Sequence, residues 1–241
     1  MLTNPTLYPA IFQRKSVRSY ADIPLSAEQL TDIKALLAEV RPLLPDQRFH
    51  LELAPAKEGW RIYGYCEDTP LGNANLGCVM QQLDLALFLK GLGRLWYGFG
   101  RDPRTKAAPK GLSYAMCLKA GNAAEPIARE AGEFNRKPIA EVIADEALRE
   151  VFEPVRLAPS ARNSQPWLFV KGEGGIHVFC ANSGGIMKVL GLGRMNQVDM
   201  GICLCHAALS FAQQGKAFEP RVLDGLAAPA GYYYLLTLET A

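Results

Sequence analysis

Apolar residues recur at helical spacing in two parts of the chain, each time behind a residue that caps helices well. Ser26 and Gln29 have the form of a capping box, and apolar residues then follow at helical spacing as far as Val40. In the second half of the chain, Asp145 is placed to cap a helix whose apolar face extends to Val155. The pattern therefore predicts one amphipathic helix in each half.

Strand-like and longer helical segments follow these two helices. Four segments of strand length are rich in apolar residues, namely 60–66, 112–118, 175–181 and 232–238. Two longer helices are predicted around 83–87 and 198–202, and both are apolar on most faces. Helices of that kind are expected to pack against each other in the centre of a protein.

The order helix, strand, helix, strand thus occurs twice, which indicates a duplicated unit. The basic pair Arg14-Lys15 also recurs, as Arg136-Lys137. We therefore expect a single unit with an α+β fold, made of two pseudo-symmetric halves, 1–125 and 126–241, each with helices and mainly antiparallel strands. The alternative is ordinary α+β periodicity with chance matches between apolar segments.

Composition places the chain among soluble globular proteins. Of its 241 residues, 49% are hydrophobic and 21% are charged, and the formal net charge is +2. This balance gives no general reason to bind nucleic acid or anionic lipid. No leader pattern opens the chain and no apolar run is long enough to span a membrane, so we expect a cytoplasmic protein.

Cysteine and histidine do not indicate a metal site. The six cysteines form no C-x-x-C pair and most lie in apolar runs, which predicts buried thiols in a reducing compartment. None of the three histidines has the spacing of a zinc ligand, so structural histidines are expected.

The densest local charge is the loop Arg14-Lys15-Ser16-Val17-Arg18. Two guanidiniums, an ammonium and a hydroxyl within five residues can surround a phosphate, because arginine offers forked donors and lysine adds a point charge. The alternative is a solvated basic turn.

A second segment, Ala158–Trp167, connects the amphipathic helix of the second half to a strand. Its small residues let the backbone approach a flat ring, while Ser160 and Asn163 supply directed hydrogen bonds that suit the edge of a cofactor. The alternative is a plain helix-to-strand connection. Trp167 opens an apolar strand and is predicted to be a core anchor.

The third segment is Gly91-Leu92-Gly93-Arg94-Leu95-Trp96-Tyr97-Gly98. It is not a dinucleotide fingerprint, because it ends a helix rather than opening one after a strand. Gly91 and Gly93 are predicted to be C-terminal caps of that helix.

These three segments resemble the flavin-dependent nitroreductases, in the fused two-half form found in bacteria and archaea. The R-x-S-x-R loop, the A-P-S-A-x-N-x-Q-P-W segment and the G-x-G-x-x-W-x-G helix exit all stand in the form typical of that family. The resemblance covers the chain from about Ile11 to the final strand. It implies an α+β sandwich with FMN in a cleft between the halves.

The resemblance also implies residues for the cofactor. The ribityl phosphate and the pyrimidine side of the flavin would be bound by Arg14, Lys15, Ser16 and Arg18, with further phosphate contacts from Arg136 and Lys137. The ring would be lined from the opposite half by Pro159, Ser160, Ala161 and Asn163. Near its central ring would lie Trp96, Tyr97 and Gly98, with a backbone N–H directed toward N5.

The second copy of the site is expected to be inactive. The repeated basic loop, Arg136–Ala140, lacks the serine and the second arginine. In the first half, Pro42–Gln47 stands where the partner loop would be. We therefore expect one FMN per chain, and a monomer, because a fused pair has already buried its dimer interface.

By the same resemblance, bound FMN would take a hydride from NADH or NADPH and pass it to a small aromatic acceptor such as a nitro compound or a quinone. No catalytic side chain is required. Reduced flavin is negatively charged near N1, and Lys15 is expected to stabilise that charge. Two alternatives stay open: a protein that binds flavin without turnover, and an interaction protein that has lost FMN.

Overall fold

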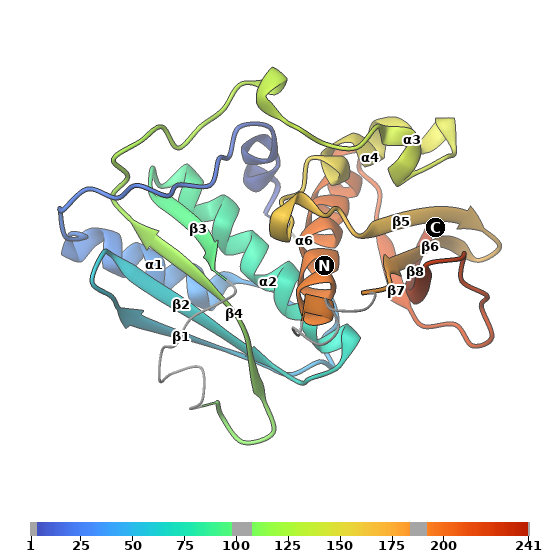
Figure 1. Ribbon diagram of the computed structural model, residues 1–241, viewed down its shortest axis with the longest axis horizontal. Helices are drawn as coiled ribbons and strands as arrows, with labels where there is room; N and C mark the ends of the chain where they lie inside the picture. The colour runs from blue at the N-terminus through green and yellow to red at the C-terminus, as the bar shows by residue number, and fades with distance from the viewer. Residues whose placement is uncertain (1–3, 98–107, 184–191, 241) are drawn as a thin grey trace.

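The computed structural model describes residues 4–97, 108–183 and 192–240. Figure 1 shows two antiparallel sheets on either side of a central pair of helices. The α+β fold with antiparallel strands, expected from the sequence, is confirmed.

The two four-stranded sheets have the same order of strands. The first has the order β1-β2-β4-β3 and contains β1 (Phe49–Pro55), β2 (Trp60–Cys66), β3 (Gly93–Tyr97) and β4 (Ser113–Gly121). The second has the order β5-β6-β8-β7 and contains β5 (Trp167–Gly172), β6 (Gly175–Ala181), β7 (Phe218–Arg221) and β8 (Tyr232–Thr240). Each sheet has a register shift in its second strand, after Gly64 in β2 and after Val178 in β6.

The helices are α1 (Ala27–Glu39), α2 (Pro70–Leu89), α3 (Ile139–Val142), α4 (Arg149–Arg156) and α6 (Leu192–Gln213). The predicted capping box of α1 is confirmed: Ser26 Oγ accepts from the N–H of Gln29 at 3.1 Å, and Gln29 Oε1 accepts from the N–H of Ser26 at 2.8 Å. Asp145 caps a short 3-10 turn that leads into α4, rather than α4 itself.

The helices α2 and α6 form the centre of the core, as predicted (Figure 1). Two glycines let them approach closely, because a methyl group at Gly77 would overlap the carbonyl oxygen of Val198. One at Gly201 would likewise overlap that of Ala74. Both helices are therefore surrounded by protein on most sides, which explains why their sequences are apolar almost all round. None of the described helices is long and apolar enough to cross a bilayer.

The end of α2 confirms one predicted glycine cap and corrects the other. Gly91 has φ +73°, and its N–H donates to the carbonyl of Phe88 at 2.9 Å. The next N–H, of Leu92, donates to Leu87 at 3.0 Å, so the turn is a Schellman motif. Gly93 is not a cap. It begins β3, because the Schellman turn has already reversed the chain.

The cysteines and two of the three histidines, His177 and His206, are buried in this framework. All six cysteines are buried, as predicted. His206 of α6 lies between Pro154 and Gln81, with Nδ1 at 2.8 Å from the carbonyl of Pro154 and Nε2 at 3.0 Å from the amide nitrogen of Gln81. Because a carbonyl can only accept, Nδ1 carries the proton, and burial lowers the pKa of His206 to about 3. It is a neutral structural histidine.

Candidate functional site

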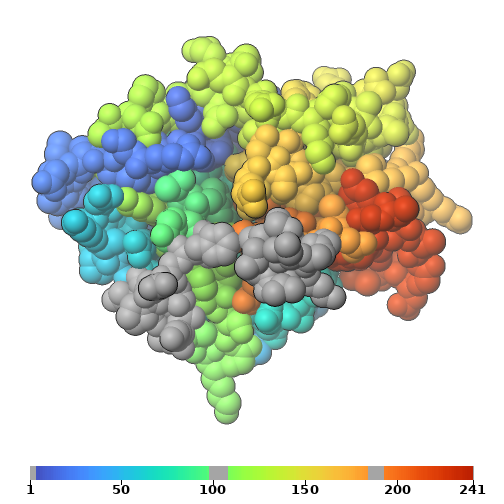
Figure 2. Space-filling view, in the orientation of Figure 1, coloured from blue at the N-terminus to red at the C-terminus, as the bar shows by residue number. Residues whose placement is uncertain are grey.

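A cavity of about 300 Å³ lies between the two halves. Its lining residues come from the basic loop, from β3 and β4, from the segment after α4 and from α6: Ser16, Arg18, Leu95, Trp96, Tyr97, Met116, Pro159, Ser160, Ala161, Arg162, Met195, Asp199 and Ile202. In Figure 2 the N-terminal segment (blue) and the segment around residue 160 (yellow) meet on one face of the molecule. The structure thus brings together the three segments that the sequence singled out.

Arg14 of the basic loop points into the core rather than into the cavity. It is 2% exposed, and its Nε lies 2.8 Å from Oδ2 of Asp84 on α2. Its Nη2 donates to Ser16 Oγ at 3.1 Å. A second guanidinium, of Arg94, lies 3.8 Å from Oδ1 of the same carboxylate, and burial lowers the pKa of Arg94 to about 10. Arg14 therefore anchors the loop and orients Ser16.

The other members of the basic loop have different surroundings. Ser16 and Arg18 line the cavity. Lys15 does not, and its Nζ lies 4.0 Å from Oε1 of Glu133. The backbone is held by the N–H of Val17, which donates to the carbonyl of Arg94 at 2.9 Å.

An acid outside the predicted set also holds this loop. A carboxylate oxygen of Glu125 accepts from the backbone N–H groups of Ser19 and Arg18, and these bonds lower the pKa of Glu125. The position of Arg18 is therefore fixed by its backbone, while its side chain is exposed at the cavity.

The strand β3 supplies the aromatic part of the lining. Trp96 and Tyr97 both line the cavity, and Tyr97 is 43% exposed. The guanidinium carbon of Arg61 lies 5.6 Å from the centroid of the Tyr97 ring. Gly98, the third residue expected here, lies outside the described residues.

The segment between α4 and β5 is strained and tightly braced. Three of its residues adopt the left-handed conformation that favours glycine, namely Arg162 (φ 54°), Asn163 (φ 58°) and Gln165 (φ 48°). Ser160 Oγ accepts from the N–H of Gln165 at 2.9 Å, and the N–H of Ala161 donates to Asp199 Oδ2 at 2.9 Å. Strain of this kind persists only where surrounding contacts impose it, and it concentrates at functional sites.

Arg136 and Lys137 brace the same segment from behind. The Arg136 guanidinium donates to the carbonyl of Ala158 at 3.1 Å and to Asn163 Oδ1 at 2.9 Å. Lys137 Nζ donates to the carbonyl of Gln165 at 3.0 Å. Neither side chain lines the cavity. Burial lowers the pKa of Arg136 to about 10, with smaller contributions from nearby cations.

Some residues of the site were not found from the sequence. Asp199, Met195 and Ile202 come from α6, and Asp199 is buried, which raises the pKa of its carboxyl well above the usual range. Asp199 could have been identified from the sequence, because it is a single acid in an otherwise apolar helix. Arg129 stands near Arg14 and Arg18, and its guanidinium lies over the ring of Phe134 at 4.8 Å. Nothing in the local sequence marks it.

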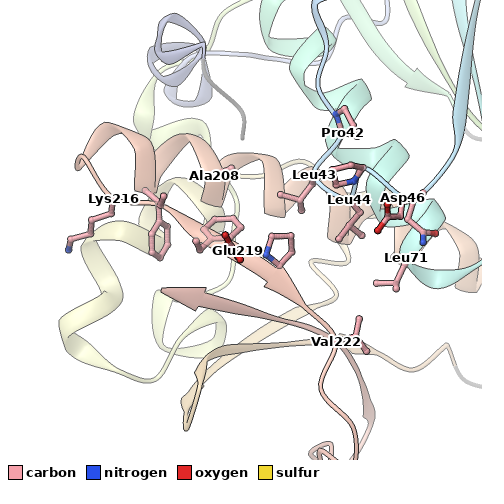
Figure 3. A pocket seen from close by; sticks show the side chains of 15 residues that line it. Pro42, Leu43, Leu44, Asp46, Leu71, Ala208, Lys216, Glu219 and Val222 are labelled. Atoms are coloured by element: carbon pink, nitrogen blue, oxygen red, sulfur yellow. The ribbon is translucent and has the colours of Figure 1, made fainter. Parts of the chain in front are cut away.

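A second cavity, of about 530 Å³, lies against the central helices (Figure 3). Its lining comes from Pro42–Gln47, from α2 and α6, and from the chain around β7. The Pro42–Gln47 segment is braced by Asn75, whose Oδ1 accepts from the N–H of Leu44 at 2.9 Å and whose Nδ2 donates to the carbonyl of Gln47 at 3.0 Å. Leucine, phenylalanine and proline dominate the described part of this lining, and its one cation is Lys216.

Comparisons with known proteins give a single family. Residues 6–211 match the family model described as "Putative TM nitroreductase". A crystal structure of a "putative nitroreductase" from Thermotoga maritima is 20% identical, covers 97% of this chain and 94% of its own, and superposes with a TM-score of 0.64. A nitroreductase with bound FMN from Desulfitobacterium hafniense is 14% identical over 57% of this chain and 100% of its own, with a TM-score of 0.45. An FMN-dependent nitroreductase from Clostridium difficile is 14% identical over 52% of this chain and 93% of its own, with a TM-score of 0.44. A comparison with curated protein sequences gives no match.

Proposed function

Because the chain belongs to the nitroreductase family, we propose that it is a flavin-dependent oxidoreductase with one FMN in the cavity between its halves. The substrates proposed are NADH or NADPH as hydride donor and a small aromatic acceptor such as a nitro compound or a quinone. One observation carries the proposal: the basic loop and the Ala158–Trp167 segment, far apart in the sequence, line the same cavity.

The lining of the cavity fits a flavin. Apolar side chains supply flat and flexible walls for a ring system, among them Leu95, Met116 and Ile202. Polar groups stand at its edge, where Ser16 and Arg18 come from one half. The opposite half contributes backbone and a hydroxyl at Ser160. A mostly apolar pocket with a few directed polar groups is typical of cofactor sites.

The residues expected from the sequence then divide into two groups. Those proposed to touch the cofactor line the cavity: Ser16, Arg18, Trp96, Tyr97, Pro159, Ser160 and Ala161. Those proposed to position them lie behind it: Arg14, Arg136, Lys137 and Asn163. Lys15 and Arg129 are proposed to add positive charge at the phosphate, because Lys15 belongs to the basic loop and Arg129 stands near Arg14 and Arg18.

When bound, FMN would supply the redox chemistry, which is hydride transfer from the nicotinamide to the acceptor. The protein contributes charge, orientation and exclusion of water. Arg18 lines the cavity, so it is placed to favour a negatively charged reduced cofactor. The braced Ser160–Gln165 backbone keeps its groups fixed, so little reorganisation is needed during the reaction.

The two halves are proposed to be a fused pseudo-dimer, with a single working site. Equal strand order in the two sheets supports this, as does the position of the second cavity against the equivalent loop and edge strand. Among its described lining residues that second cavity has one cation, Lys216, and two acids, Asp46 and Glu219, whereas two arginines line the first cavity. One FMN per chain follows, and the chain itself is expected to be a monomer.

The test uses purified protein saturated with FMN and then freed of excess. Flavin absorbance against protein concentration should give a ratio near one, and a ratio near two or near zero would overturn the single-site proposal. Anaerobic addition of NADH or NADPH should then bleach the flavin, and an added nitroaromatic or quinone should restore its colour. Tight binding without bleaching would instead indicate a flavin-binding protein without turnover.

A further inference from the structure

One cation at the cavity has no role in holding the fold. Arg162 lines the cavity and is exposed, and its guanidinium makes no hydrogen bond or ion pair with any described residue. The segment around it is braced by other groups, through Ser160, Asn163 and Gln165. The side chain of Arg162 is therefore available to a ligand in the cavity.

The backbone at this position makes the choice of arginine informative. Arg162 has φ 54°, in the left-handed region that glycine occupies without steric penalty. For a residue with a Cβ, that conformation costs roughly 1–2 kcal/mol. A turn that needed only this backbone shape would be more stable with glycine. The side chain of Arg162, rather than the shape of its backbone, therefore explains why an arginine stands at this position.

The surroundings of Arg162 are positively charged. Arg18 lines the same cavity from the other half, and Arg61 lies over the ring of Tyr97, a further lining residue. Among the described lining residues the only acid is Asp199, which is 2% exposed and accepts the N–H of Ala161. Glu125 is engaged by the backbone of the basic loop. Cavities with one sign of charge attract ligands of the other sign.

We propose that Arg162 is a specificity-determining residue that binds an anionic substituent, such as a carboxylate, on the aromatic acceptor. Aromatic anions are then better acceptors than neutral molecules of the same shape. The inference rests on the proposed flavin site and deepens it. Arg162 lines the cavity itself. The anionic group that reaches it is therefore carried by the aromatic ring of the acceptor, which enters the cavity. The 2′-phosphate of NADPH, far from the nicotinamide ring, is the other source of such a group.

The first experiment measures equilibrium binding without turnover. Benzoate and the neutral benzamide are titrated into the oxidised, FMN-loaded protein, and the change in flavin absorbance gives each dissociation constant. Wild type should bind benzoate about tenfold more tightly, as expected for a charge-assisted pair. Arg162→Gln should remove that preference, and Arg162→Lys should keep part of it. Arg149→Gln is the matched control: Arg149, a partly exposed arginine at the start of α4, pairs with Glu146, and its replacement should leave both dissociation constants unchanged.

A glycine variant separates recognition from structure. Arg162→Gly should lose the preference for benzoate while its thermal stability stays the same or rises, because the left-handed backbone is relieved. In turnover, kcat/KM for 4-nitrobenzoate relative to 4-nitrobenzamide should fall about tenfold in both Arg162→Gln and Arg162→Gly.

Three results would overturn the proposal. One is an equal loss of benzoate and benzamide binding in Arg162→Gln, which would indicate packing. Another is an unchanged preference for the anion. The third is an effect confined to NADPH relative to NADH, which would assign the arginine to the nicotinamide phosphate. The FMN content of every sample is counted first, so failure of the wild type to take up flavin disproves the proposed function and is distinct from these outcomes.

Discussion

Replacing Asp84 with asparagine tests whether the core and the candidate site are joined through one buried carboxylate. Asp84 is fully buried on α2, with Arg14 Nε at 2.8 Å and Arg94 Nε at 3.8 Å. Asp84→Asn keeps the shape of the side chain and removes its charge. Two buried guanidiniums are then left without a counter-ion.

The expected cost follows from the burial of the pair. Removing one partner of a buried ion pair costs about 3–5 kcal/mol, because the remaining charge stays desolvated. For a chain of 241 residues this corresponds to a fall in Tm of roughly 6–20 °C. Flavin affinity should fall as well, since Arg14 orients Ser16 and the carbonyl of Arg94 holds Val17.

The assay is denaturant unfolding of the flavin-free protein, followed by circular dichroism, so that cofactor binding does not add to the apparent stability. Asp32→Asn is the control, because Asp32 pairs with Lys90 at 2.9 Å near the surface. A half-exposed pair of that kind contributes about 1 kcal/mol at most. If Asp84→Asn cost no more than the control, the ion pair would not be holding the basic loop.

Three further predictions concern the core and the cofactor. His206→Gln should make the protein less sensitive to acid: the unfolded histidine takes up a proton below about pH 6.5 while the buried one stays neutral down to about 3. Wild type should therefore lose about 1.4 kcal/mol per pH unit across that window relative to the variant, and parallel pH profiles of unfolding midpoints would refute this. Gly77→Ala should lower the free energy of unfolding by about 3 kcal/mol, because the new methyl group meets a backbone carbonyl that cannot rotate away. Gly132→Ala is the control and should be neutral, because its methyl group meets nothing within 4 Å. In anaerobic stopped-flow, Arg18→Ala should slow flavin reduction about tenfold and Lys15→Ala much less, since only Arg18 lines the cavity; the opposite order would restore Lys15 to the position that the sequence favours.

Local patterns in the sequence were enough for the parts of the fold that depend on near neighbours. The capping box at Ser26 and the central helices were found because their signals lie within a few residues. Trp167, predicted to be a core anchor, is 1% exposed. The strand β3 was missed because it begins immediately after the helix-terminating turn at Gly91, and five residues are too few to show alternation.

Residues whose partners are distant in the sequence were harder to predict. Arg14 belongs to a loop with the composition of a phosphate site, yet its guanidinium is paired with a carboxylate 70 residues away. A pattern among neighbouring residues in the sequence does not predict such an ion pair. Arg136 and Lys137 raise the same difficulty, since a basic pair has the same composition whether it meets a phosphate or braces a strained backbone.

The two aspartates of the central helices show why matching segments alone does not assign roles. Asp84 and Asp199 stand at matching positions in similar sequence segments, but their contacts differ. Asp84 forms an ion pair with Arg14, whereas Asp199 accepts the backbone N–H of Ala161. The residue that does in the first half what Asp199 does in the second is Asn75, which holds the backbone of Leu44. An amide is therefore sufficient to hold a loop against these helices. What distinguishes the cavity between the halves is the two arginines that line it, Arg18 and Arg162, and those are set by the loops rather than by the helices.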